Sequence, residues 1–313
     1  MKSLKKLTAI ILTITLLISS GISAFAVVDE LWGVPFLAYG ASLTNYQRNE
    51  ILDIFGLTDN EDGVHFDSIY VNGSDLVYFL GTGNPNSNML SSVLISHRAP
   101  GTGVEVAILT PDYITRVTAT QYATAMITAG VTDALVEVAA PTAVTGEAAL
   151  AGIYKAFSER GIELDEDRMA VAQEQLSLLA NIANYHKDND DFDSYALDKA
   201  VIELQSKLAD HFQATGELAT AEEIQAFVAN VMRNNNLEDI LTSEQIQRIR
   251  GFAGNFQLTD AINSQAFRDQ LNNLGNRLTN MIGNLDINID IDRGTFVSWW
   301  NNFMSWLRHL LKM

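Results

Sequence analysis

The spacing of apolar residues changes near Gly161, and this change constrains the fold more than any other feature of the chain. Between Val27 and Arg160, short β-branched runs alternate with segments of helical period, whereas almost every later segment has the helical period alone. This order predicts an α+β fold, in which a small mixed sheet with covering helices is followed by an α-helical bundle. The expected divisions are an α+β domain over 27–160, a helical bundle over 161–283 and a final segment over 284–313.

Strands are expected where β-branched and apolar residues run together. The predicted strands are Ser68 to Asn72, Ser91 to Arg98, Val104 to Thr110 and Ala134 to Ala140. The five-residue, glycine-containing loop 99–103 favours an antiparallel hairpin between the second and third of these strands. The last strand is nearly all apolar, so we expect it in the centre of the sheet.

Helices are expected to begin at recognisable caps. Thr44 with Gln47 and Thr118 with Gln121 form the Thr-x-x-Gln capping box, Ser74 is a candidate N-cap, and a helix is expected from Thr145 to Arg160. In the second half, the predicted helices are Asp165 to His186, Asp191 to Ala214, Thr220 to Asn234, Thr242 to Gly254 and Thr259 to Gly283.

The first 26 residues have the pattern of a secretory signal peptide. Three lysines precede the apolar run 7–18, and Ala24 and Ala26 supply the small residues that a signal peptidase recognises. We therefore expect a secreted or extracellular protein, associated with the cell envelope. Removing this stretch, which holds three lysines and no acid, takes the formal charge from −18 to −21 over 287 residues.

Charge and cysteine content exclude several classes of protein. A chain with 38 acidic and 20 basic residues repels phosphate backbones, so no nucleic-acid partner is expected. The absence of cysteine rules out disulfides, thiolate metal sites and a cysteine nucleophile. His-Glu-x-x-His, Gly-x-Ser-x-Gly and phosphate-loop motifs are also missing, so the sequence gives no catalytic residues and predicts no cofactor beyond weak calcium binding.

Several separate blocks of sequence resemble one protein family. They are Tyr39-Gly40-Ala41-Ser42-Leu43-Thr44 followed by Gln47-Arg48, then Phe55-Gly56, Thr128-Ala129-Gly130-Val131, Val138-Ala139-Ala140-Pro141, 145–150 and 152–156. Together they resemble the secreted family of Gram-positive bacteria named domain of unknown function 1002. The resemblance implies export and a shared fold, and it brings no established activity or catalytic residue.

An alternating acidic segment near the C-terminus is a weak metal-site candidate. Asp286, Asn288, Asp290 and Asp292 alternate with isoleucines, so an extended strand would place four oxygen-bearing side chains on one face. Calcium prefers such ligands, but Ile291 and Val297 stand where an EF-hand loop needs glycine and glutamate. The alternative is a half-buried strand with a solvated face. The acids Asp188, Asp190, Asp191 and Asp193 are interpreted as a solvated loop that caps a helix.

The last segment predicts an amphipathic helix. Trp299, Trp300, Phe303, Trp306 and Leu310 recur at helical spacing, with polar and basic residues mostly opposite them. Two interpretations stand: the stripe packs on the chain's own bundle, or it contacts a membrane surface or an envelope partner. The sequence as a whole favours an exported, non-enzymatic envelope-associated or binding protein. The alternative is an extracellular hydrolase of cell-wall polymers that uses paired carboxylates.

Either interpretation of the C-terminal helix removes its tryptophans from water. We expect blue-shifted tryptophan emission in the presence of liposomes, and Trp306→Ser should abolish any shift that needs lipid. A shift that needs lipid indicates membrane binding, whereas blue emission without lipid and a lower melting temperature after truncation at Gly294 indicate internal packing. Emission typical of hydrated tryptophan with and without lipid would contradict both.

Overall fold

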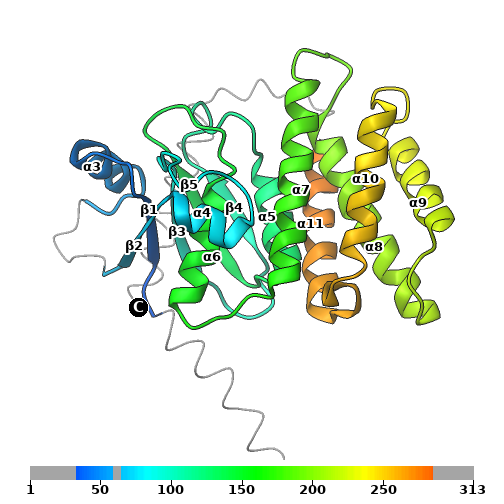
Figure 1. Ribbon diagram of the computed structural model, residues 1–313, viewed down its shortest axis with the longest axis horizontal. Coiled ribbons are helices and arrows are strands. Elements are labelled where there is room, and N and C mark those ends of the chain that lie inside the picture. Colours follow the sequence, from blue (N-terminus) through cyan, green and yellow to red (C-terminus); the bar gives the residue numbers. More distant parts are fainter. Residues whose placement is uncertain (1–32, 59–64, 285–313) are drawn as a thin grey trace, which may run out of the picture. The chain divides into compact units, whose positions relative to one another are not determined.

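The computed structural model describes residues 33–58 and 65–284 (Figure 1). Within these residues, five strands form one sheet in the order β2-β1-β3-β5-β4. The strands are β1 (Phe36–Gly40), β2 (Asp67–Val71), β3 (Ser92–His97), β4 (Glu105–Ile108) and β5 (Ala134–Ala139). Strand β3 runs antiparallel to β1 and β5, whereas β1 with β2 and β4 with β5 are parallel pairs. The small mixed sheet predicted from the sequence is therefore present.

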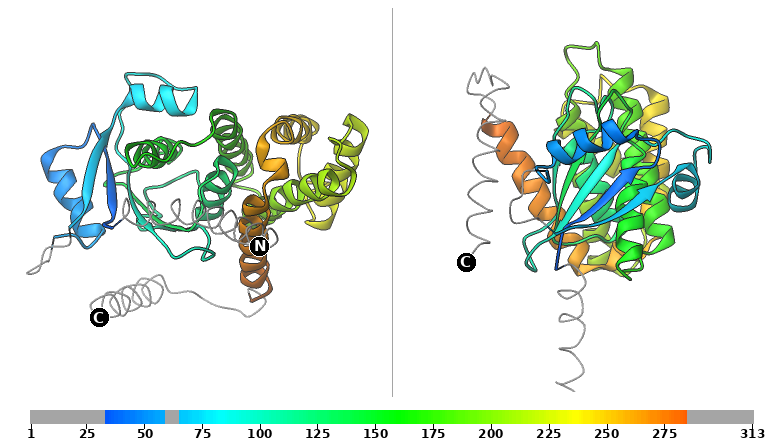
Figure 2. Two further views of the ribbon diagram at one scale, coloured as in Figure 1. Left: turned by 90° about the horizontal axis from the view of Figure 1, so that it is seen from below. Right: turned by 90° about the vertical axis from the view of Figure 1, so that its left-hand side faces the viewer.

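Strand β1 was not predicted, because both of its faces are covered and its five residues show no alternation of apolar and polar side chains. Leu37 and Tyr39 lie in a core cluster with Ile51 of α3 (Asn45–Ile54). On the other face, α6 (Ala149–Glu159) brings Gly152 close to Ala38 and Val93. Helices α3 and α6 thus cover opposite faces of the sheet, as Figure 2 shows.

The predicted hairpin between β3 and β4 is wrong, because β5 lies between these two strands and pairs with both. The loop after β3 is held away from a tight turn: the amide of Gly103 donates to Asp133 Oδ1 over 2.8 Å, and that of Val104 to Gln270 Oε1 over 3.0 Å. With the loop anchored in this way, the chain passes to the far side of β5, where it forms β4. Strand β5 is buried along its whole length and interior to the sheet, although β3 occupies the centre.

The predicted capping boxes are confirmed at Thr44, Thr118, Thr220 and Thr242. Helix α4 (Gly73–Leu80), however, is capped by Asn72 rather than Ser74, because the Asn72 side chain accepts from the amides of Ser74 and Asp75. Helix α6 begins at Ala149 rather than Thr145, since the intervening residues include Gly146 at φ +96° and cannot continue a helix.

The second half is helical, as predicted. It contains α7 (Glu166–Tyr185), α8 (Ser194–Thr215), α9 (Ala221–Asn234), α10 (Ser243–Phe256), the 3₁₀ turn η1 (Asp260–Asn263) and α11 (Gln265–Asn284). Helix α8 starts at Ser194 rather than Asp191, with Asp193 as its N-cap. The predicted helix from Thr259 is broken, because Ser264 is extended at ψ 119° and separates η1 from α11.

Helix α5 (Ala119–Ala129) joins the sheet layer to the helices of the second half. It packs on β4 and on α7, and its residues from Thr120 to Ala129 are all buried. At its end, Arg168 of α7 donates from Nε to the carbonyl of Thr128 over 2.7 Å and from Nη2 to that of Ile127 over 3.0 Å. Figure 2 shows α5 and α7 side by side.

Of the described residues, those up to Gly275 belong to one compact unit and those from Asn276 belong to a second. The change from mixed structure to helices alone lies between α6 and α7, close to Gly161. The domain boundary at that point stays a prediction. None of the helices in the described ranges is both long and apolar enough to cross a bilayer.

Substitution of Gly146 tests the packing of the segment before α6. Gly146 has φ +96°, and an added Cβ would lie 2.7 Å from Ile114 Cγ2 and from the Tyr122 hydroxyl. Gly146→Ala is expected to lower the free energy of unfolding by about 2–4 kcal/mol, measured by urea denaturation. Gly216→Ala is the matched control: its φ is +74° and its Cβ meets nothing, so only the backbone cost of about 1 kcal/mol applies. Equal effects would contradict the close packing.

Candidate functional site

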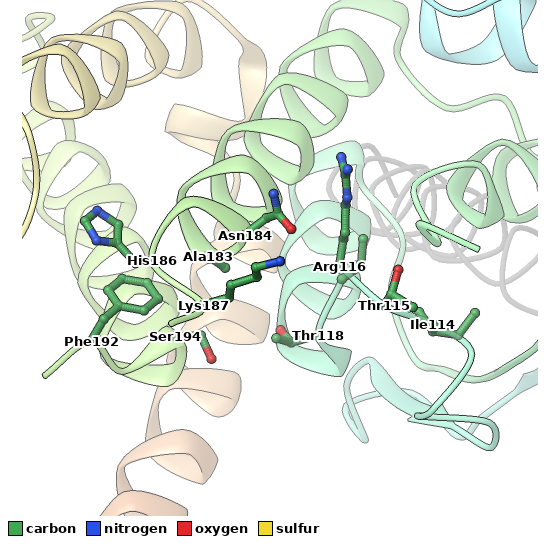
Figure 3. A pocket seen from close by; sticks show the side chains of 11 residues that line it. Ile114, Thr115, Arg116, Thr118, Ala183, Asn184, His186, Lys187, Phe192 and Ser194 are labelled. Atoms are coloured by element: carbon green, nitrogen blue, oxygen red, sulfur yellow. The ribbon is translucent and has the colours of Figure 1, made fainter. Parts of the chain in front are cut away.

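An open groove of 360 Å³ lies between the segment that leads into α5 and the turn from α7 to α8 (Figure 3). Its apolar lining comes from Ile114, Val117, Ala183 and Phe192, with the ring of His186 beside them. Its polar lining comes from Thr115, Arg116, Thr118, Asn184, Lys187 and Ser194. The groove therefore combines an apolar floor with a polar and cationic rim.

The first wall of the groove is fixed by the loop that precedes α6. Thr115 donates to the carbonyl of Val144 from both its amide, over 3.0 Å, and its hydroxyl, over 2.9 Å. Ile114 forms a bridge with Val144, and the side chains of Ile114 and Val117 are buried. Since the residues on either side of it are held, Arg116 projects from a fixed stretch of backbone.

The second wall is the end of α7 and the turn that follows. His186 is the C-cap of α7, and its buried ring stacks on that of Phe192, with centroids 4.9 Å apart and planes inclined by 23°. Its Nε2 is 3.0 Å from Gln245 Oε1 of α10. Neighbouring Lys187 is exposed, and in Figure 3 its side chain extends toward the segment that carries Arg116 and Thr118.

The electrostatics of the groove contrast with the net charge of −18. Arg116 and Lys187 form no ion pair with any residue in the part of the chain that the structure describes. The N-terminus of α5 begins at the rim, whereas that of α8 is already capped by the Asp193 carboxylate, which accepts from the Tyr195 amide over 2.9 Å. The charged side chains in the lining are thus both cationic, while the second wall's turn also carries the exposed acids Asp188, Asp190, Asp191 and Asp193.

A buried carboxyl group lies beneath the groove. Asp198 of α8 is 1% exposed; its Oδ2 accepts from the Thr118 hydroxyl over 2.9 Å, and its Oδ1 from Gln121 Nε2 over 3.0 Å. Burial raises the pKa of Asp198 to about 7, because loss of hydration outweighs these two hydrogen bonds, and nearby Asp193 adds to the rise. The capping box of α5 is thus bound to α8 through a single titratable group.

The chemistry available in the groove is recognition by charge, hydrogen bonding and apolar contact. Asp198, whose raised pKa is typical of functional groups, is covered by Thr118 and Gln121 and faces no open space. No group of three or more histidine or carboxylate side chains within residues 33–58 and 65–284 is placed to hold a metal ion.

The predicted site residues fall mostly beyond the described residues. Asp286, Asn288, Asp290 and Asp292 lie outside them, as do Trp299, Trp300, Phe303, Trp306 and Leu310. The acidic loop before α8 is exposed, and Asp193 caps that helix, as predicted.

The groove itself was missed by the sequence analysis. Arg116 stands next to a predicted cap and Lys187 just past a predicted helix end, so neither belongs to a recognisable motif. The sequence did carry a signal for Asp198. This residue lies on the same face of its helix as Ile202 and Gln205, and an acid on a buried face needs hydrogen-bond partners.

Replacing Asp198 with asparagine tests the buried carboxyl group. The unfolded carboxyl releases its proton near pH 3.8 and the folded one near pH 7, so this group's contribution to stability falls as the pH rises through that window. The free energy of unfolding of the wild type relative to Asp198→Asn should fall by about 2–3 kcal/mol from about pH 5 to about pH 8, measured in urea. A difference that does not change with pH would contradict the assignment.

Comparison with known proteins places this architecture in a family. A relative from Bacillus subtilis (strain 168), described as uncharacterized protein YpuA, is 27% identical over 285 residues, which cover 88% of this chain and 91% of the relative. No solved structure matches the chain significantly. The model of a family described as a protein of unknown function, DUF1002, matches residues 39–274. The chain therefore belongs to the DUF1002 family.

Proposed function

We propose that this member of the DUF1002 family is an exported, non-enzymatic binding protein, and that the groove between α5, α7 and α8 receives its ligand. The observation that carries the proposal is the composition of the groove, an apolar floor below two cationic side chains that have no ionic partner in the described part of the chain. Its volume lies near the lower end of the range for small-molecule sites.

Binding without catalysis fits the placement of the acidic groups. A carboxylate hydrolase needs two acids that face the same substrate. Among the described residues that line the groove none is acidic, and Asp198 behind them uses both of its oxygens inside the protein, on the capping box of α5. The groove presents hydroxyl, amide and cationic groups instead, which bind and orient a ligand.

Work at the cell envelope is part of the same proposal. It is supported by the leader pattern in residues 1–26 and by the amphipathic spacing of Trp299, Phe303, Trp306 and Leu310. In this proposal the C-terminal segment contacts the membrane surface or an envelope partner.

A variant that fills the groove tests the proposal. The probe is a mixture of about a hundred small aromatic and aliphatic fragments, neutral and charged, followed through the amide NMR signals of the mature protein. We expect fragments to shift the signals of Thr115, Lys187 and Ser194. Ala183→Phe places a large side chain in the groove and should abolish these shifts. Asn181→Phe on the exposed side of the same helix is the matched control and should retain them.

Two results would overturn the proposal. One is that no fragment at millimolar concentration shifts the groove signals, or that Ala183→Phe leaves the shifts unchanged. The other is release of new reducing ends or amino groups from purified peptidoglycan by the wild type, lost in Ala183→Phe, which would identify a hydrolase.

A further inference from the structure

We infer that the groove selects a small monoanion, a carboxylate on a compact apolar body. This inference rests on the proposed binding function and adds the chemical class of the ligand. The cationic rim, the apolar floor and the net charge of the chain each support one part of it.

The cationic rim supplies the recognition of charge. Arg116 lines one wall of the groove and Lys187 the other, and each side chain can donate to a carboxylate. The planar guanidinium of Arg116 matches the two oxygens of a carboxylate, and the Lys187 ammonium adds a point charge. The hydroxyl of Thr115 is already donated to Val144, so the remaining donors in the lining include the two cations, Asn184 and Ser194.

The apolar floor sets the nature of the ligand's body. Phe192, Ile114 and Val117 line the groove together, and Phe192 is held by its stack on the His186 ring. A flat or short apolar group placed against Phe192 removes apolar surface from water on both sides. A bare inorganic anion would leave this floor unused.

The net charge of the chain favours a single negative charge on the ligand. With a formal charge of −18, or −21 without residues 1–26, the protein repels a dianion or a polyanion more strongly than a monoanion. The exposed acids Asp188, Asp190, Asp191 and Asp193 belong to the turn that forms one wall, so they add a local repulsion that grows with the negative charge of the ligand. Among anions, a monocarboxylate therefore makes the contacts in the groove with the least electrostatic repulsion.

The experiment compares four probes that isolate charge and shape: benzoate, its neutral isostere benzamide, the cation benzylamine and inorganic phosphate. Each is titrated at about pH 7.5 and about 0.15 M salt, with the Thr115 and Ser194 amide signals as the readout. We expect benzoate to bind about tenfold more tightly than benzamide, and benzylamine and phosphate to bind more weakly than either.

Charge variants assign the effect to the two side chains. The double substitution Arg116→Gln and Lys187→Gln should weaken benzoate binding about tenfold and leave benzamide within about twofold, and each single variant should give an intermediate loss. Lys207→Gln removes the same charge at a position about 20 Å along α8 from Ser194, and it should change the affinity for neither probe. Phe192→Leu should weaken benzoate and benzamide alike.

The outcomes separate this inference from the proposed function. Equal affinity for benzoate and benzamide, tighter binding of benzylamine or phosphate, or benzoate binding unaffected by the charge variants would overturn the monoanion assignment. If neutral fragments still bind to the wild type and Ala183→Phe abolishes their binding, the proposed binding function stands without this ligand class. If no probe reaches the groove, both fail.

Discussion

The fold depends on satisfying the polar groups of a helix that is buried on every side. Helix α5 contacts the sheet through β4, and its Tyr122 hydroxyl donates to the carbonyl of Gly146, yet Gln121 and Thr128 find their partners on the helices of the second half. Asp198 of α8 accepts from its capping box, Gln175 of α7 and Gln205 of α8 hydrogen-bond Thr128, and Arg168 covers its last carbonyls. Because an unpaired polar group in this position costs about 1–3 kcal/mol, the sheet layer and the helices constrain one another.

The groove follows from the same arrangement. The capping box of α5 meets α8 one turn beyond that helix's start, so the N-termini of the two helices come close together. The segment that leads into α5 forms one wall, and the turn that leads into α8 forms the other. Polar side chains needed for packing therefore lie directly below the side chains that we propose for binding.

Local signals predicted local structure well, and pairings between distant segments could not be predicted. A Thr-x-x-Gln or Thr-x-x-Glu box fixes a helix start through contacts three residues apart, and all four Thr boxes are correct. The hairpin prediction failed because β5, which pairs with β3, follows α5 in the chain. Contacts of Gly103 and Val104 with Asp133 and Gln270 hold the loop after β3 in place. Arg116 and Lys187 line the same groove for the same reason, through tertiary structure that no spacing encodes.

The insertion of β5 between β3 and β4 also determines when the sheet can close during folding. Until the residues of β5 and the intervening helix α5 are available, β3 and β4 each present an open edge with unpaired backbone groups. Pairings over such separations form slowly, since the chain must first lose the entropy of the intervening loop. The partly folded chain is therefore prone to wrong strand pairing and aggregation. When β5 forms, it pairs with the facing edges of β3 and β4 at the same time.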